Sequence, residues 1–251
     1  MYAEERRQAI ADIARRDGRV EVAWLADELA VTPETVRRDL TDLERRGLLR
    51  RVHGGAIPTD RFAGELALGD KADVMATEKR RIAKAATAFV PGAGTVLLDA
   101  GTTTGELATV FPDGELTVIT NALPIATSLA GRQLGVYLVG GRVRGRTLAA
   151  VDAWALATLA DLRVDVAFVA TNGLSAQRGL STHDPAEAAV KQAMIDAADQ
   201  VVLLADHTKV GTEQLVRYAS LEQVDVFVCD TGLPDEQAEE LAAAGPRVVR
   251  A

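Results

Sequence analysis

The sequence contains little of what several classes of protein require. Cys229 is the single cysteine among 251 residues, which excludes an internal disulfide framework. No apolar run approaches the ~20 residues of a membrane span, and the charged start at Glu4 and Glu5 is not followed by the apolar region of a secretion signal. Three histidines are too few for a histidine-rich metal site. We therefore expect a cytoplasmic protein without a membrane span, a metal ion or a cofactor.

Acidic charge is present but unevenly distributed. The chain carries 28 Lys and Arg against 36 Asp and Glu, a net charge of −8. Residues 1–59 hold 11 arginines and 11 acidic residues, which leaves 17 basic and 25 acidic residues for positions 60–251. Positions 31–59 hold six arginines and four acidic residues, so a mild positive charge is concentrated in one segment. Contact with nucleic acid is expected there.

That segment has the pattern of a capped amphipathic helix. Thr32 stands where an N-cap is expected, and Pro33 suits the first helical turn. Val36, Leu40 and Leu43 then fall on one face, which predicts that this face is buried. The residues left on the outward face are Thr35, Arg37, Arg38 and Thr41.

Shorter patterns on both sides complete a winged helix-turn-helix domain over residues 1–58. The expected elements are a helix over 4–16, a strand over 20–22, a helix over 23–29, the capped helix, and wing strands over 48–51 and 56–58 joined at Gly54 and Gly55. The second of these helices offers Trp24, Leu25 and Leu29 to the core. The capped helix would enter a major groove. The predicted DNA-contacting residues are Thr32, Thr35, Arg37, Arg38, Thr41, Arg50, Arg51, His53 and Gly54.

The helix arginines also allow a purely structural interpretation, in which they form a solvated face and pair with Glu34, Asp39 and Asp42. One arginine alone would favour that interpretation. Six arginines in 29 residues, followed by a glycine-tipped hairpin, favour DNA contact instead.

Beyond an expected linker over 59–76, where periodicity is lost, the pattern changes. Short apolar runs alternate with helical stretches, which is typical of a mostly parallel sheet covered by helices on both faces. The predicted strands lie at 95–99, 116–120, 136–139, 165–170, 201–205 and 225–229. The fold class is therefore α/β, with a second domain over 77–251.

In such sheets ligands bind beyond the carboxyl ends of the strands. The first predicted strand ends at Asp99 and is followed by Gly101-Thr102-Thr103-Thr104, where glycine frees the backbone and hydroxyls precede a helix whose first N–H groups favour an anion. This pattern fits a phosphate site, but it also fits an ordinary threonine-capped helix start. It is neither a Walker A loop nor a dinucleotide fingerprint, because the lysine and the glycine spacing of those motifs are missing.

Polar residues follow the other strands as well. Asn121 suits either a sugar hydroxyl or a helix cap, and Gly140-Gly141 allows close approach of a ligand beside three arginines. Asp184 and Glu187 have the spacing of a capping box, and Glu187 and Lys191 that of a helix ion pair. At a sheet mouth the same carboxylate and ammonium would also suit a sugar hydroxyl and a phosphate. The remaining strand ends hold Asn172, Gly173, Asp206 and Lys209.

Taken in order, these motifs resemble those of the DeoR-type family of bacterial transcriptional regulators, and the likeness covers nearly the whole chain. It is carried by Thr35-Val36-Arg37-Arg38-Asp39-Leu40, Arg51-Val52-His53-Gly54-Gly55-Ala56, Asp99 to Thr104, Thr120-Asn121, Gly140-Gly141, Asn172-Gly173, Glu187 to Lys191 and Asp206 to Lys209. The resemblance implies a repressor that a phosphorylated sugar releases from double-stranded operator DNA. It also implies a homodimer or homotetramer and a sensor domain similar to ribose-5-phosphate isomerase.

For matching positions, the resemblance implies Gly101 to Thr104 with Lys191 or Lys209 around the phosphate. Near sugar hydroxyls it implies Asp99, Asn121, Asn172 and Glu187. The segment 172–185 is similar to regulators of fructose uptake, which makes fructose 1-phosphate the preferred effector.

Two other classes of protein stay open at this point. One is an active sugar-phosphate isomerase with Glu187 or Asp206 as its base. The other is a nucleotide-binding adaptor that uses its N-terminal helices for protein contact.

Overall fold

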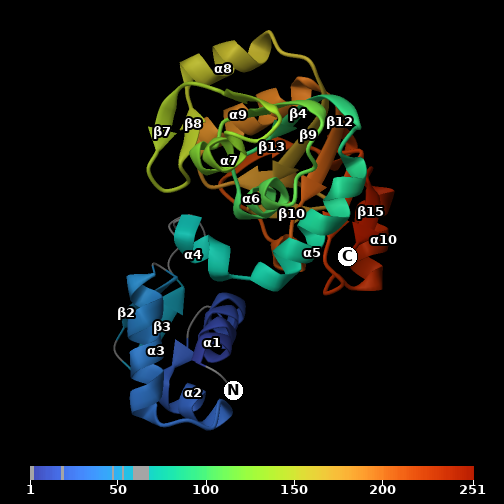
Figure 1. Ribbon diagram of the computed structural model, residues 1–251. Coiled ribbons are helices and arrows are strands. Elements are labelled where there is room, and N and C mark those ends of the chain that lie inside the picture. Colours follow the sequence, from blue (N-terminus) through green and yellow to red (C-terminus); the bar gives the residue numbers. More distant parts are fainter. Residues whose placement is uncertain (1–2, 18–19, 47, 53, 59–67) are drawn as a thin grey trace. The chain divides into compact units, whose positions relative to one another are not determined.

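The computed structural model describes residues 3–17, 20–46, 48–52, 54–58 and 68–251. The chain divides into two compact units, Met1–Leu66 and Ala67–Ala251 (Figure 1). Each unit has its own apolar core. None of the described helices is both long enough and apolar enough to cross a membrane.

The N-terminal unit is a winged helix-turn-helix, as predicted. Its elements are α1 (Ala3–Asp17), β1 (Val20–Glu21), α2 (Val22–Glu28), α3 (Pro33–Arg45), β2 (Leu49–Val52) and β3 (Gly55–Pro58). The three strands form an antiparallel sheet in the order β1-β3-β2, so β2 and β3 make the wing.

Helix α3 begins and packs as its sequence indicates. The Thr32 hydroxyl caps it by accepting the backbone N–H of Thr35 at 3.2 Å, and Pro33 is its first residue. Val36, Leu40 and Leu43 are at most 1% exposed and share a core with Ile10 of α1 and Leu25 of α2, among others. The prediction that Trp24 is available for this core is wrong, because that side chain is 44% exposed.

The C-terminal unit is built on a seven-stranded parallel sheet. In sheet order the strands are β15 (Arg247–Arg250), β14 (Val226–Cys229), β12 (Ala198–Leu204), β9 (Val164–Ala170), β4 (Ala93–Leu98), β5 (Glu115–Thr120) and β6 (Gly135–Leu138). The chain runs from β4 outward to β6 in one direction and from β9 outward to β15 in the other. The strand order therefore reverses between β4 and β9, which is where ligands bind in sheets of this kind.

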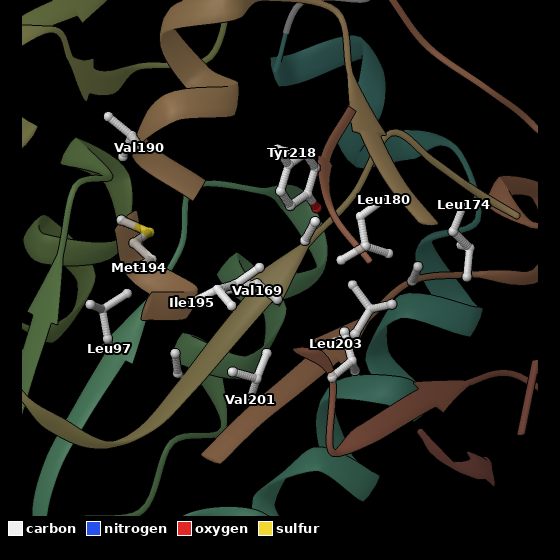
Figure 2. Close-up of a cluster of buried hydrophobic side chains, with 14 of the residues drawn as sticks. Leu97, Val169, Leu174, Leu180, Val190, Met194, Ile195, Val201, Leu203 and Tyr218 are labelled. Atoms are coloured by element: carbon white, nitrogen blue, oxygen red, sulfur yellow. The ribbon is translucent and has the colours of Figure 1, made fainter. Parts of the chain in front are cut away.

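Helices cover both faces of this sheet (Figure 1). Along β4 the side chains alternate, so Val96 and Leu98 join the core beneath α5 (Ala76–Ala86), α6 (Thr102–Thr109) and α7 (Leu123–Leu129). Leu97 joins the core on the opposite face, with residues of α8 (Ala153–Ala160), α9 (Pro185–Asp196) and α10 (Asp235–Ala243). Figure 2 shows Val190, Met194 and other members of this second core. The predicted layering is confirmed.

Several smaller elements were not anticipated. They are α4 (Leu68–Asp73), the 3₁₀ turns η1 (Thr87–Phe89), η2 (His207–Lys209) and η3 (Leu221–Gln223), the hairpin of β7 (Arg142–Arg144) with β8 (Ala149–Val151), and an antiparallel sheet of β10 (Gly173–Ser175), β11 (Gly179–Thr182) and β13 (Val216–Ala219). Helix α4 lies inside the segment that we interpreted as linker. It contacts α6, so it belongs to the C-terminal unit.

Candidate functional site

The outward face of α3 carries the cations predicted to contact DNA. Arg37 and Arg38 are exposed, and the Thr41 hydroxyl donates to the carbonyl oxygen of Arg37 at 2.8 Å. Arg51 of β2 reaches the same place, because its Nη1 donates to the Thr41 hydroxyl at 3.2 Å. The wing carries Gly54, exposed, with a φ of +80° that favours glycine.

Two of the predicted contacts lie outside this description. His53 is not among the described residues, and of Arg50 only the backbone, in β2, is described.

The acidic residues of α3 leave part of the positive charge on this outward face unpaired. Asp39 is 2% exposed and accepts hydrogen bonds from the Nε atoms of Arg6 and Arg7 of α1, at 2.6 and 3.2 Å. Arg37 pairs with Glu34 at 3.4 Å. Arg38 makes no ion pair with any residue that the structure describes. The helix arginines are thus not all neutralised from within their own helix.

In the C-terminal unit a buried ion pair occupies the switch point between β4 and β9. Asp99 is 1% exposed, and its Oδ2 accepts the backbone N–H of Ala170 at 3.0 Å. Lys191 of α9 is 4% exposed and donates both to Asp99 Oδ2 and, at 2.9 Å, to the carbonyl oxygen of Ala170. Burial opposes the charge on Lys191, but the Asp99 carboxylate outweighs it and raises the pKa of Lys191 above its ordinary value. The pair therefore ties α9 to the two central strands.

Glu187, one turn before Lys191, has other partners than the sequence spacing suggests. Asp184 caps α9 by accepting two backbone N–H groups at 2.9 and 3.0 Å. Instead of completing a capping box or pairing with Lys191, Glu187 accepts hydrogen bonds from Arg144 Nη1 at 2.6 Å and from the Thr147 hydroxyl at 2.5 Å. A carboxylate held by a guanidinium and a hydroxyl, and 6% exposed, is poorly placed to act as a general base.

The predicted phosphate loop forms the start of α6, and this start has no side-chain cap. Gly101 is the N-cap residue, with extended backbone. The Thr104 hydroxyl donates to the carbonyl oxygen of Gly101 at 3.1 Å, while Thr103 and Thr104 are buried. The first N–H groups of a helix have no intrahelical acceptor, so they are available here to another acceptor. The interpretation of this stretch as a threonine-capped helix start is therefore wrong.

A cavity of about 270 Å³ opens at this terminus. Its wall includes Gly101, Thr102 and Glu106, Leu68 and Ala72 of α4, and Thr147. Small-molecule pockets usually begin at about 300 Å³, so the space is close to that of a small ligand site. Because Thr147 also bonds Glu187, the cavity adjoins the charged cluster, where Asp99, Asn121, Glu187 and Lys191 line a second, closely packed space.

Asn121 supports the loop that leads into α6. Its side-chain oxygen accepts the N–H of Ala100 at 3.1 Å, and its amide donates to the carbonyl oxygen of Ala150 at 3.1 Å. The alternative role as a helix cap is not realised, because Ala122 is the N-cap residue of α7.

The other predicted effector residues lie at neighbouring strand ends in contacts of their own. Asn172 accepts the Thr182 hydroxyl at 2.8 Å, and a Cβ at Gly173 would lie 2.5 Å from the carbonyl oxygen of Thr212. Asp206 caps η2 by accepting the N–H of Thr208 at 3.1 Å. The remaining three members of this group are Gly140, Gly141 and Lys209.

These three residues differ in how closely they are packed. Gly140 faces open space, whereas a Cβ at Gly141 would lie 2.5 Å from the carbonyl oxygen of Val151. Lys209 Nζ lies 3.9 Å from Asp206 Oδ2. The structure thus gathers Asp99, Asn121, Glu187 and Lys191 in one cluster, with Gly101 and Thr102 beside it at the cavity.

Sequence reasoning missed two residues of the cluster. Arg144 stood only as one of three loop arginines, but its side chain is 13% exposed and binds Asp184 at 3.3 Å as well as Glu187. Tyr218 donates its hydroxyl to the carbonyl oxygen of Ala170 at 3.1 Å, and burial raises its pKa to about 12. No local pattern distinguishes either residue, because both acquire their roles through partners far away in the chain.

A second buried cation, Lys79 of α5, was also missed. It is 4% exposed and donates to the carbonyl oxygen of Lys71 in α4. Burial lowers its pKa to about 8, although the carboxylates of Asp206 and Glu106 act in the opposite direction. Asp206 Oδ2 is itself buried and has no hydrogen bond among the described residues.

Two family profiles match the chain in the order of its two units. The DeoR-like helix-turn-helix domain matches residues 6–62, and the DeoR C terminal sensor domain matches residues 74–231. The chain belongs to the DeoR family. This membership identifies the N-terminal unit as a DNA-binding domain, the C-terminal unit as a sensor domain, and the whole chain as a transcriptional regulator.

Full-length relatives of this DeoR-family chain are regulators as well. The HTH-type transcriptional regulator GlpR of Haloferax volcanii is 38% identical over 248 residues, which cover 98% of this chain and 97% of that protein. The lactose phosphotransferase system repressor of Staphylococcus aureus is 34% identical over 234 residues, which cover 92% and 93% of the two chains. The isomerase and adaptor alternatives are therefore rejected.

One solved structure with a similar arrangement is ribose 5-phosphate isomerase A from Methanocaldococcus jannaschii. It shares 13% sequence identity over 55% of this chain and 56% of its own, with a TM-score of 0.39. A likeness at this level does not extend to activity.

Proposed function

We propose that the protein is a repressor of a sugar-utilisation operon and that a phosphorylated sugar releases it from its operator. The observation that carries this proposal is the uncapped start of α6, which opens on a cavity beyond the carboxyl ends of β4 and β5. A helix start with free N–H groups binds anions, and phosphate in particular. The names of the relatives support a role in sugar metabolism, since one is a lactose phosphotransferase system repressor.

In this proposal the phosphate lies against the backbone N–H groups of Thr102, Thr103 and Thr104. The sugar extends toward Thr147 and the cluster of Asp99, Asn121, Glu187 and Lys191, which adjoins the cavity. Asn172, Gly140, Gly141, Gly173, Asp206 and Lys209 stand further along the strand ends and are proposed to act on larger effectors or on the loops around the site. Fructose 1-phosphate is the first effector to test.

DNA binding is proposed to use α3 and the wing. Arg38 is assigned a base contact, because it is exposed and unpaired within the described residues. Thr32, Thr35, Arg37, Thr41, Arg50, Arg51, His53 and Gly54 are assigned to phosphates and to the adjoining groove. Two or four copies, associated through their sensor domains, would present paired recognition helices to a repeated operator.

Release follows from linkage between the two sites. If the sugar phosphate binds better to the form that does not bind DNA, a typical coupling of ~1–3 kcal/mol lowers operator affinity ~5–150-fold. The test is a fluorescence anisotropy titration of operator DNA at constant salt, with and without saturating fructose 1-phosphate. An unchanged operator affinity with every phosphorylated sugar that binds would contradict the proposal.

Finding those sugars requires a separate screen by thermal unfolding. A ligand at ~100 times its dissociation constant adds ~2.7 kcal/mol to the stability of the native state. Unphosphorylated sugars serve as controls, because the proposed site recognises the phosphate.

A further inference from the structure

Helix α8 turns an uncharged face to the solvent, at the periphery of the sensor unit (Figure 1). Its inward residues Ala155 and Leu159 are buried in the core of the sheet. None of its eight residues is charged, and the Thr158 hydroxyl donates to the carbonyl oxygen of Trp154 at 3.0 Å, so this polar group is already bonded. The exposed residues of the outward face are Ala153, Trp154, Ala157, Thr158 and Ala160.

Helix α10 shows that the sheet does not impose such a face. Residues of α8 and α10 pack into the same core, on the same side of the sheet. Helix α10 exposes Asp235, Glu236, Glu239 and Glu240, which give it the charged outward face that is usual for a helix in contact with water. The uncharged face of α8 therefore indicates that another surface covers it in the assembled protein.

The face is large enough to be the centre of a stable contact. Trp154 is 79% exposed, and Tyr137 of β6 and Val143 of β7 are 65% and 42% exposed. Tyr137 stands on the α8 side of the sheet, because its register neighbour Ile119 shares a core with Ala155. An aromatic side chain buries roughly 150–250 Å², so Trp154 and Tyr137 supply a large part of the ~800 Å² per partner of a standard interface.

The shape of this face fits a second copy of the chain. A contact across a two-fold axis requires that one surface hold both a projection and the depression that receives it. Trp154 is the projection, and the small side chains of Ala157 and Ala160 leave room for it. We propose that two copies associate with α8 antiparallel to its own copy, centred on Ala157, so that Trp154 packs against Ala160 of the second copy.

The charges at the two ends of α8 favour the same arrangement. Beside its N-terminal end lies Arg142, whose side chain is 61% exposed and whose Nε is 2.5 Å from Asp152 Oδ2. Asp161, the C-cap residue, is exposed and makes no ion pair with any residue that the structure describes. An anion is unfavourable at a helix C-terminus. In the antiparallel pair Arg142 of each copy faces Asp161 of the other, which relieves this repulsion.

This inference rests on the proposed function, because that proposal has the copies associate through their sensor domains. The hairpin of β7 and β8 connects the contact to the proposed effector site. Arg142 and Val143 of this hairpin belong to the contact, whereas Thr147, in the turn between its strands, stands in the cavity wall. A ligand that moves this turn therefore acts on the same short element that the second copy contacts.

Sedimentation velocity of the full-length protein over a concentration series tests the contact. Trp154→Ala should raise the dissociation constant of the α8 contact at least about 30-fold, the loss expected for a central tryptophan anchor. Its far-UV circular dichroism should stay that of the parent, because the side chain is exposed within one copy. Trp24→Ala removes the other tryptophan, in the DNA-binding unit, and is the matched control that should associate as the parent does.

A charge exchange tests the antiparallel direction. Arg142→Asp and Asp161→Arg should each weaken association about fivefold, as expected for an exposed ion pair, and the double variant should recover the affinity of the parent at least in part. Additive losses in the double variant would contradict the pairing of Arg142 with Asp161.

Tryptophan emission reports on the contact directly. Trp24→Phe leaves Trp154 as the single tryptophan, and its emission should move to shorter wavelength as the concentration rises through the association range. If the parent protein associates while this emission stays constant, or while Trp154→Ala associates equally well, the α8 contact is wrong and association through another surface stands. A parent protein that is monomeric at every concentration would overturn both the contact and the proposed association. Release from operator DNA by a sugar phosphate is measured separately, so its failure is distinguishable from these outcomes.

Discussion

In the DNA-binding unit the start of α3 is capped, because Thr32 accepts the N–H of Thr35, while the cation Arg38 is exposed to solvent. The sensor unit has the reverse arrangement. Its buried cation Lys191 is paired with Asp99, and the start of α6 is left without a cap. For these two pairs of groups, each unit satisfies internally the kind of group that the other unit leaves free. The free groups are suited to different anions: a flexible guanidinium to a nucleic acid, and fixed backbone N–H groups to a compact phosphate.

The largest expected effect comes from removing Lys191, the buried cation of the sensor unit. Lys191→Met leaves the Asp99 carboxylate buried without its partner, which should lower the free energy of unfolding by about 3–5 kcal/mol. Urea denaturation measures this change. The exposed Lys84→Met should change the stability by less than about 0.5 kcal/mol. A loss of stability below about 1 kcal/mol for Lys191→Met would mean that the stability of the sensor unit does not depend on this ion pair.

Removing Arg38, the exposed cation of α3, should weaken DNA binding rather than destabilise the fold. Arg38→Ala should weaken operator binding by about 1–3 kcal/mol if it makes a bidentate base contact, and should leave the unfolding free energy almost unchanged. Anisotropy with operator and with unrelated DNA at the same salt measures both affinity and specificity. Arg45→Ala, an exposed arginine in the last turn of α3, is the control. Equal losses from the two variants would contradict a base contact by Arg38.

The two helix starts should respond differently to the same substitution. Thr32→Ala removes a cap and should cost about 1 kcal/mol of stability. Thr102→Ala removes no cap, so its unfolding free energy should stay within about 0.5 kcal/mol of the parent value. Denaturant unfolding of both variants provides the comparison. A loss of stability from Thr102→Ala as large as that from Thr32→Ala would show that Thr102 caps α6.

The smallest effect is expected at Asp230, a carboxylate in the turn after β14 that accepts hydrogen bonds from backbone N–H groups. Burial raises its pKa, but the backbone N–H groups of His207 and Gly232 outweigh burial and hold the pKa below its ordinary value. A carboxylate with a lowered pKa adds stability above its ordinary pKa of about 4 and loses it as the pH falls through the folded value. Unfolding midpoints measured from about pH 6 to about pH 3 should therefore fall more steeply for the parent protein than for Asp230→Asn. Parallel curves would contradict this assignment.

Much of the fold could be predicted because its signals are local. The cap at Thr32, the buried face of Val36 and Leu40, and the apolar strands of the central sheet depend on residues a few positions apart. Trp24 could not be placed, because helical spacing alone does not say how wide the buried face of α2 is.

The cluster around the cavity could be predicted only in part. The sequence marked Asp99, Asn121, Glu187 and Lys191 as polar residues at strand ends, and the structure brings them together. Their pairing could not be foreseen, because the local rule joins Glu187 to Lys191, whereas in the fold Lys191 bonds a residue 92 positions away. Helix α4 was hidden for a similar reason: its six residues are stabilised by Lys79 and Arg146 rather than by a strong pattern of their own.

The separation of Asp99 from Lys191 also orders events during synthesis. The helix-turn-helix is complete within the first 58 residues, whereas the ion pair that ties α9 to the central strands can form only after residue 191 has left the ribosome. At about 5–20 residues per second, the intervening stretch takes roughly ten seconds to translate. In each newly made molecule the helix-turn-helix can therefore fold before the buried ion pair of the sensor unit is in place.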